Sequence, residues 1–293
     1  MGIPVNDIIY FDHAAATPLD ERVLAAQMPY FAAHFYNPSS PYAPAIQVKR
    51  DYQAAKASIA REIGAKPDEL IMTAGATESI SLAFHSVTGH VVVSSIEHDA
   101  VLAAAKQHDH TLVPVTEQGM VTVEAVAKAI RPDTELVSIA FANSELGTVQ
   151  PIRSIAAELK KVRAKRLEAG NTTPLHFHSD ASQGISALDV HVSRLGVDML
   201  TLNAGKIYGP KQIGLLWAAT HTQLKPIIRG GGQENGLRSG TENVAGVIGF
   251  ARALEFAADD RENEAARLRD LSESLRHKLA EAFPDSIFSG SKK

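Results

Sequence analysis

Apolar residues recur with helical spacing in some parts of the chain and gather in short runs in others. From Gln47 to Ile63 they recur every three or four positions, which predicts an amphipathic helix, and Gly64 follows as a typical C-terminal stop. The same reasoning predicts helices over 78–87, 123–130 and 154–169, and strands over 69–72, 91–93, 111–115, 136–141, 175–180, 199–202 and 214–217.

This alternation of strands and helices predicts an α/β fold with a mainly parallel sheet flanked by helices. Ligands bind such sheets at the carboxyl ends of the strands, so functional residues are expected in the loops that follow strands. From Glu242 onward the pattern is almost entirely helical, with an apolar stripe between Leu268 and Phe283 that needs a partner surface. We therefore expect an N-terminal segment (1–20), a large domain (21–255) and the beginning of an incomplete small domain (256–293).

The composition narrows the class of protein. The 293 residues carry a formal net charge of −4 and no long run of Lys or Arg, so a nucleic-acid or acidic-membrane partner is not indicated. The absence of Cys excludes disulfides, thiolate metal sites and thiol nucleophiles within these residues. No signal-peptide pattern and no apolar run near ~20 residues is present, which predicts a cytoplasmic enzyme.

The segment Thr73–Ser79 lies between a predicted strand and a predicted helix and consists mostly of small residues. Small residues let backbone N–H groups approach an anion, and the helix dipole favours negative charge there. Thr77 adds a hydroxyl donor. An ordinary capped helix start is the alternative, because Thr, Ser and Glu also suit the first turn of a helix.

Two further candidates follow the ends of predicted strands. A buried carboxylate at Asp180 would need a partner, either a protonated pyridine nitrogen or the start of the next helix. Lys206 follows small residues, and its amine could form a Schiff base with an aldehyde cofactor, although most single lysines simply face solvent.

A glycine-rich stretch, Gly230–Gly232, opens a loop that ends in Arg238–Thr241. Several glycines in one loop are entropically unfavourable for folding, so such a loop often approaches a ligand or another chain. A flexible linker is the alternative, but the Arg-Ser-Gly-Thr ending favours a defined structure.

In this order the motifs resemble those of the class V aminotransferase-like enzymes and, within them, the cysteine desulfurases. The resemblance implies a fold like the type I pyridoxal-phosphate transferases, with pyridoxal phosphate as the cofactor. The matching stretches span nearly the whole chain and are Tyr10–Pro18, Ala74–Ser79, Glu97–His98, Asn143–Gly147, Asp180–Gln183, Lys206–Lys211 and Arg238–Thr241.

The resemblance also implies residue roles. Lys206 would hold the cofactor covalently and later move the substrate α-proton, and His98, the second catalytic residue, would stack on the ring. Asp180 would keep the pyridine nitrogen protonated, which makes the ring an electron sink. The other cofactor contacts would come from Ala76 and Thr77 at the phosphate, Gln183 at the phenolic oxygen, Asn143, Ser144, Asn203 and Gly205, and Thr241 from the partner subunit of a homodimer.

The chain departs from the family pattern at three places. Ser144 stands where many relatives have a second Asn near the phenolic oxygen, and Asn203-Ala204-Gly205-Lys206 stands where Ser-Gly-His-Lys is common. Asn203 and backbone N–H groups would partly replace the lost phosphate donors. The family's nucleophilic cysteine and carboxylate-binding arginine are expected in a C-terminal part that this sequence does not reach.

The function that the resemblance implies is that of a cysteine desulfurase. Such an enzyme converts L-cysteine to L-alanine and passes sulfur to an enzyme thiol and on to an acceptor protein for iron–sulfur cluster or thio-cofactor synthesis. Another class V aminotransferase, a selenocysteine or cysteine lyase, and an inactive cofactor-binding scaffold are the alternatives. No metal site is predicted, because neither the pair His108 and His110 nor the pair His176 and His178 has a convincing third ligand.

Overall fold

A seven-stranded sheet forms the centre of the computed structural model, which describes residues 8–290. Its strands are β1 (Leu70–Thr73), β2 (His90–Ser94), β3 (His110–Val113), β4 (Thr134–Ser138), β5 (His176–Asp180), β6 (Met199–Asn203) and β7 (Gly214–Ala218). They lie in the order β1-β7-β6-β5-β4-β2-β3. The strands from β2 to β6 pair in parallel, and β7 runs antiparallel to both of its neighbours. The predicted mainly parallel α/β sheet is confirmed.

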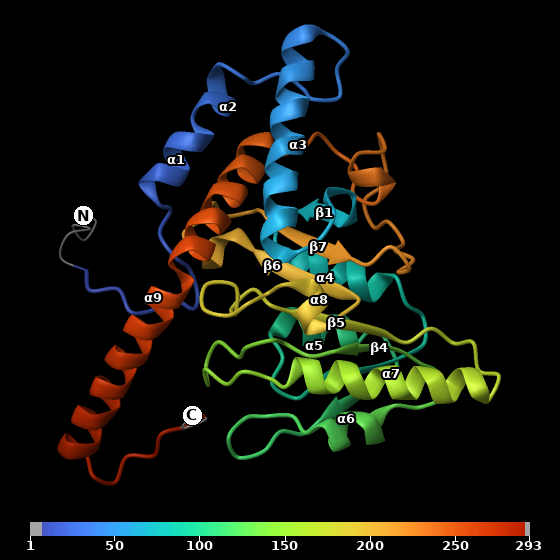
Figure 1. Cartoon of the computed structure of the whole chain (residues 1–293), viewed down its shortest axis with the longest axis vertical. Coiled ribbons are helices and arrows are strands. Elements are labelled where there is room, and N and C mark those ends of the chain that lie inside the picture. Colours follow the sequence, from blue (N-terminus) through green and yellow to red (C-terminus); the bar gives the residue numbers. More distant parts are fainter. Residues whose placement is uncertain (1–7, 291–293) are drawn as a thin grey trace.

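Helices cover both faces of the sheet, so the molecule has three layers (Figure 1). They are α1 (Glu21–Gln27), α2 (Pro29–Ala32), α3 (Ala43–Ile63), α4 (Ala76–His85), α5 (Asp99–Ala105), α6 (Val123–Ala129), α7 (Ile152–Glu168), α8 (Val192–Leu195) and α9 (Val244–Ala282). α4 and α5 pack on one face, and α3, α6, α7 and α9 pack on the other.

The strands bury side chains on both faces, as expected for a sheet covered by helices on each side. In β7, for example, Leu215 and Trp217 belong to the apolar core beneath α3 and α9, whereas Leu216 and Ala218 belong to the core beneath α4. This alternation follows from the two-residue period of a strand. Both cores together hold the sheet rigid, and its strand ends can therefore position side chains accurately.

Helix α9 begins beside α3 and α1 and then extends away from the sheet (Figure 1). Its first part is buried, but the predicted stripe from Leu268 to Phe283 is exposed. The helix passes the predicted boundary between residues 255 and 256 without a break, and the division into domains stays a prediction. The ends of the predicted segments 1–20 and 256–293, residues 1–7 and 291–293, lie outside the described residues. No helix within residues 8–290 is long and apolar enough to cross a membrane.

The predicted strands and helices agree with the structure except at their ends. Gly64 adopts the left-handed conformation (φ 66°) and closes α3, as predicted. Helix α4 begins at Ala76, two residues before its predicted start. Helix α5 was not predicted, because a segment of only seven residues, four of them Ala, has little periodic signal.

We predict that Gly214→Ala destabilises the fold at the point where β7 meets the loop before α4. A Cβ at Gly214 would lie 2.8 Å from Gly75 Cα and 2.8 Å from the carbonyl oxygen of Leu202, and both are backbone atoms. Such overpacking costs about 1–3 kcal/mol, which urea unfolding can measure. Gly230→Ala is the control, since its Cβ would meet only Ser239 Cβ, at 3.1 Å. Equal stability of the two variants would contradict the prediction.

Candidate active site

Two adjoining cavities open where the parallel strands end at their carboxyl side. One, here called the Asp180 cavity, has a volume of about 190 Å³, and the other, the α4 cavity, about 530 Å³. Ala76, Thr77, Asn203 and Lys206 line both. All predicted site residues except Gly205 and Thr241 line the Asp180 cavity, and Gly205 lines the α4 cavity. The structure therefore brings together residues that are far apart in the sequence.

Asp180 is the last residue of β5 and lies at the cavity wall. Its Oδ1 accepts a hydrogen bond from the backbone N–H of Ser182 at 3.0 Å. Burial raises the pKa of Asp180, although the nearby His98 and Lys206 oppose the shift. Within residues 8–290 no cation forms an ion pair with this carboxyl group, and the buried Ser182 Oγ has no hydrogen-bond partner. A cationic N–H donor in the cavity would satisfy the Asp180 carboxyl group.

Lys206 ends a short 3₁₀ turn, Ala204–Lys206, that follows β6. Asn203 caps this turn by accepting a hydrogen bond from the Gly205 N–H at 3.1 Å. The Lys206 Nζ donates to the carbonyl oxygens of Ala14 and Ala15 at 2.6 and 2.8 Å. Burial lowers the pKa of Lys206, which increases the fraction of neutral amine.

The N-terminal segment crosses this lysine and is fixed to the same loop. Thr17 donates from Oγ1 to the Gly205 carbonyl at 3.1 Å and accepts from the Tyr208 N–H at 2.8 Å. Lys211 donates to the Thr17 carbonyl. This segment contains the Tyr10–Pro18 motif, so the structure gives the motif a concrete position over Lys206.

His98 caps the start of α5 and lines the Asp180 cavity. Its Nδ1 accepts a hydrogen bond from the Ala100 N–H at 3.1 Å, so in the neutral ring the hydrogen resides on Nε2. The preceding residue, Glu97, is buried, and its carboxylate accepts from Ser94 Oγ at 2.5 Å and the Ala140 N–H at 2.9 Å. Glu97 thus joins the ends of β2 and β4 and fixes the backbone that carries His98.

The sequence motifs do not reveal this role of Glu97, although the Glu97–His98 pair marks its place. Burial raises the pKa of Glu97 to about 7, and the charge of nearby Asp180 adds to the effect. Glu97 and Asp180 repel each other when both are ionised, so the negative charge of one disfavours ionisation of the other.

Gln183, Asn143 and Ser144 also line the Asp180 cavity, but their hydrogen bonds differ. Gln183 Nε2 donates to the Ala14 carbonyl at 2.9 Å. Asn143 Nδ2 donates to the Ile96 carbonyl at 2.9 Å, and its Oδ1 accepts from the next turn of its own loop. Asn143 thus organises the loop, whereas Ser144 is exposed at the cavity.

Helix α4 points its N-terminus at the α4 cavity. Its N-cap is Gly75, whose φ of 142° suits glycine and which offers no side chain to the first N–H groups. Glu78 accepts from the Ala74 N–H at 2.7 Å and forms an ion pair with Arg238 at 2.9 Å. The first turn of α4 is therefore open to an anion and is tied to the Arg238–Thr241 segment.

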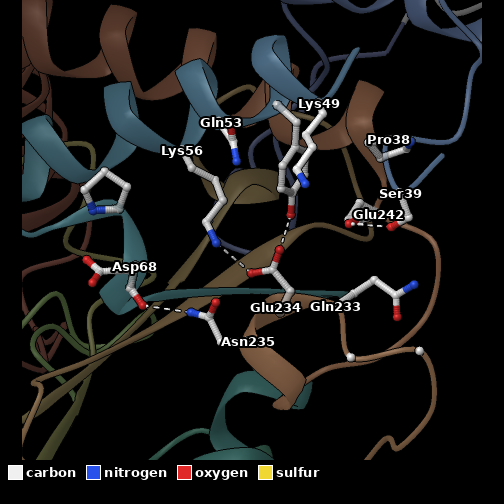
Figure 2. A pocket seen from close by; sticks show the side chains of 14 residues that line it. Pro38, Ser39, Lys49, Gln53, Lys56, Asp68, Gln233, Glu234, Asn235 and Glu242 are labelled. Carbon is white, nitrogen blue, oxygen red and sulfur yellow. Dashed lines mark hydrogen bonds and ion pairs between the residues drawn. The ribbon is translucent and has the colours of Figure 1, made fainter. Parts of the chain in front are cut away.

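The glycine-rich loop is held by Glu234, whose side chain is only 5% exposed. Its carboxylate pairs with Lys56 at 2.9 Å (Figure 2) and also accepts from Tyr52 and from the Met72 N–H. The loop is thus defined rather than a flexible linker. It carries Thr241 to a separate cavity beside Tyr52, so this residue does not reach the Asp180 cavity of its own chain.

The residues of the two cavities fit a pyridine aldehyde that carries a phosphate. Asp180 offers an acceptor without an ion-pair partner, Lys206 offers an amine of lowered pKa, and the N-terminus of α4 offers unpaired backbone N–H groups. Because Ala76 and Thr77 line both cavities, these first residues of α4 would hold the phosphate of a cofactor bound by Asp180 and Lys206.

Comparison with known families gives a consistent result. The family model described as "Aminotransferase class-V" matches residues 9–290. Cysteine desulfurase IscS 1 of Archaeoglobus fulgidus is 40% identical over 91% of this chain and 70% of its own length. Cysteine desulfurase IscS of Dictyoglomus turgidum is 38% identical over 96% of this chain and 72% of its own length.

Solved structures agree with the sequence relatives. A NifS-like protein superposes with a TM-score of 0.87 at 33% identity, covering 93% of this chain and 76% of the other. A structure described as SspA in complex with cysteine superposes with a TM-score of 0.76 at 37% identity, covering 85% of this chain and 72% of the other.

We predict that the buried Glu97 makes the protein less stable as the pH rises. The carboxyl group of Glu97 titrates near 4.5 in an unfolded chain and near 7 in the fold. The contribution of Glu97 to the free energy of unfolding is therefore fully present below pH 4.5. It is lost as the pH rises through about 7, and the loss is on the order of 3 kcal/mol. Asp180 acts in the same direction.

Urea unfolding of the wild type and Glu97→Gln at pH 5 and pH 8 tests this expectation. The variant should lose clearly less stability between the two values, because glutamine still accepts the Ala140 N–H but does not titrate. Glu145→Gln, an exposed carboxyl group in a nearby loop, should behave like the wild type. An unchanged pH dependence in Glu97→Gln would refute the role of this group.

Proposed function

Because the chain belongs to the class V aminotransferase family and, within it, to the cysteine desulfurases, we propose that it binds pyridoxal phosphate and takes L-cysteine as substrate. The family is one of pyridoxal-phosphate enzymes, and bound pyridoxal phosphate acts as an electron sink that stabilises negative charge at the substrate Cα. The observation that carries the proposal is that Asp180, Lys206 and the N-terminus of α4 surround two joined cavities.

We propose the following roles for the residues of the chain. Asp180 keeps the pyridine nitrogen protonated, and its carboxylate gains the cationic partner that the cavity otherwise lacks. Lys206 holds the cofactor and afterwards moves the proton at the substrate Cα, since its lowered pKa makes the neutral amine accessible. His98 packs against the ring, and its Nε2–H group serves as a hydrogen-bond donor in the cavity.

The remaining predicted contacts complete this proposal. Ala76 and Thr77 offer backbone N–H groups and a hydroxyl to the phosphate, and Asn203 and Gly205 shape the turn before Lys206. Gln183 turns from the Ala14 carbonyl to the phenolic oxygen. Ser144 is close to the same cavity wall, whereas Asn143 supports the loop that carries it.

The overall reaction is the transfer of one sulfur atom. L-cysteine and a thiol give L-alanine and a persulfide, so the C–S bond of the substrate breaks and an S–S bond forms. The 293 residues contain no Cys, so the accepting thiol has to be supplied by other residues or by an added compound. The chain spans about 70% of the length of the relatives described above.

Four features are proposed from the sequence alone. A homodimer would let Thr241 serve the partner's phosphate, which agrees with its position outside the Asp180 cavity. A sulfur-acceptor protein follows from the same resemblance, and a cytoplasmic location follows from the sequence pattern, which shows neither a signal peptide nor a long apolar run. The division into a large domain up to residue 255 and a smaller one beyond it belongs with them, and it agrees with the end of the buried part of α9 near Leu254.

We predict that borohydride reduction of the protein incubated with pyridoxal phosphate attaches a pyridoxyl group to Lys206. The amine condenses with the cofactor aldehyde, water leaves, and hydride makes the bond stable. Peptide mass mapping locates the group. Lys206→Arg keeps the positive charge but should lose the label, whereas labelling confined to exposed lysines away from the cavities, such as Lys160 on α7, would exclude the proposed site.

Measurement of substrate turnover distinguishes a desulfurase from an aminotransferase and from an inactive cofactor-binding scaffold. Alanine should form when the protein loaded with pyridoxal phosphate receives L-cysteine and an added thiol, and Lys206→Arg should lose this activity. Cofactor binding without alanine would favour the inactive scaffold, and alanine formation from added pyruvate with a different amino acid as amino donor would favour an aminotransferase.

We also predict that Asp180→Asn weakens the binding of pyridoxal phosphate by about tenfold or more. A charge-assisted hydrogen bond contributes roughly 1.5–3 kcal/mol, and asparagine removes the charge. Absorbance titration at equilibrium measures the dissociation constant. Asp189→Asn, which alters a carboxylate paired with Arg194 elsewhere, should bind normally, and normal binding by Asp180→Asn would contradict the assigned pairing.

A further inference from the structure

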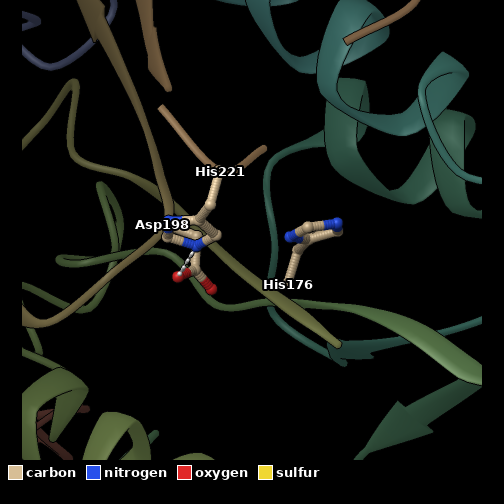
Figure 3. A group of neighbouring side chains, drawn as sticks. All are labelled: His176, Asp198 and His221. Carbon is tan, nitrogen blue, oxygen red and sulfur yellow. Dashed lines mark hydrogen bonds and ion pairs between the residues drawn. The ribbon is translucent and has the colours of Figure 1, made fainter. Parts of the chain in front are cut away.

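A second polar cluster lies at the opposite ends of the strands from the two cavities, where β5 and β6 begin and β7 ends. His176 begins β5, Asp198 immediately precedes β6, and His221 follows the end of β7. These strands are neighbours in the sheet, and β7 runs antiparallel to β6, so its end lies beside the beginning of β6. The three side chains come from separate parts of the sequence and meet only because of this topology (Figure 3).

The geometry of these side chains is close to that of a metal site. One potential ligand atom from each residue lies within 4.8 Å of the other two. His221 Nε2 lies 3.0 Å from Asp198 Oδ1, and the rings of His176 and His221 stack with centroids 6.5 Å apart. Ligands of tetrahedral zinc are separated by about 3.4 Å, given bonds of about 2.0–2.1 Å. The His221–Asp198 pair already has nearly this spacing, and the exposed His221 has room to adjust.

Asp198 is held in a fixed orientation from behind. Its Oδ2 accepts from the Phe177 N–H at 2.7 Å and from the Arg163 guanidinium. Arg163 is itself fixed to the Leu175 carbonyl at 2.8 Å. These bonds occupy Oδ2 and leave Oδ1 directed at His221, which is how outer hydrogen bonds orient a metal-binding carboxylate. The Arg163 charge also lowers the affinity for a cation, so moderate rather than very tight binding is expected.

The cluster differs from the other histidines of the chain. His178, on the same face of β5, hydrogen-bonds Ser138 and Thr201 at 2.8 and 2.9 Å, and burial lowers its pKa to about 3. It is a core histidine, whereas His176 faces Asp198 and His221. Within residues 8–290 this is the one group of three or more His, Asp or Glu with metal-ligand spacing. The sequence analysis paired His176 with His178, whereas the fold brings His176 together with Asp198 and His221.

We propose that His176, Asp198 and His221 bind one divalent transition-metal ion, best matched by Zn²⁺, with water at the fourth position. Two imidazoles and one carboxylate are a ligand set that zinc accepts in tetrahedral geometry. The ion would link the beginnings of β5 and β6 to the end of β7. It would stabilise the three strands whose opposite edge carries Asp180, Asn203 and Gly214 without touching the cavities.

Zinc titration of the untagged, chelator-treated protein against a chromogenic chelator tests the proposal. One Zn²⁺ per chain is expected in the wild type, and His176→Ala and His221→Ala should each weaken binding by about tenfold or more. His85→Ala removes another exposed imidazole and should leave binding unchanged. Asp198 is not substituted, because it also holds Phe177 and Arg163.

Two further measurements distinguish loss of the metal ligands from unfolding of the variants. Zinc should raise the midpoint of thermal unfolding in the wild type and in His85→Ala but not in His221→Gln, whose exposed position makes the change tolerable to the fold. Cobalt should give the visible absorption of a tetrahedral site with the wild type. It should not do so with the His176 or His221 variants. Absence of stoichiometric zinc binding, or binding that both histidine substitutions leave unchanged, would overturn the proposal.

Discussion

Two carboxyl groups without an ion pair within residues 8–290 organise the carboxyl ends of the parallel strands, namely the buried Glu97 and the partly buried Asp180. Glu97 takes its donors from Ser94 and Ala140, and Asp180 takes one from Ser182. The Glu97 bonds connect the ends of β2 and β4, and the Asp180 bond closes the turn after β5. Burying carboxylates in this way is unfavourable, so the edge is a region of low stability until a cationic group pairs with Asp180. Ligand binding and stability are therefore coupled at this edge.

The fold could be predicted because most strands have an apolar run and the longer helices have a periodic face, whereas the short helices α1, α2, α5 and α8 were not predicted. The direction of β7 could not be, since a short strand buried on both faces has the same pattern read either way. Its direction matters, because it sets Gly214 against Gly75 and so leaves room for the turn before α4. The resemblance to a known family supplied the site motifs, but not this contact.

The site was less predictable where the backbone does the binding. The carbonyl oxygens of Ala14 and Ala15 hold Lys206, yet a carbonyl group leaves no mark in a sequence. Glu234 pairs with Lys56 across a separation of 178 residues, and the glycine-rich stretch predicted a defined loop without indicating which residue anchors it. Interactions of this kind depend on which loops meet, and that depends on the strand order.

The same dependence explains why the two edges of one sheet can hold different chemistry. Between His176 and Asp180, β5 spans roughly 13 Å, so the two edges do not touch each other. They still share the backbone of β5 and β6, and a closely packed sheet resists changes in strand spacing. A ligand that fixes these strands at one edge therefore reduces the freedom of the strand ends at the other. No residue belongs both to the His176 cluster and to the two cavities. Coupling between them therefore has to be transmitted by the strands that they share.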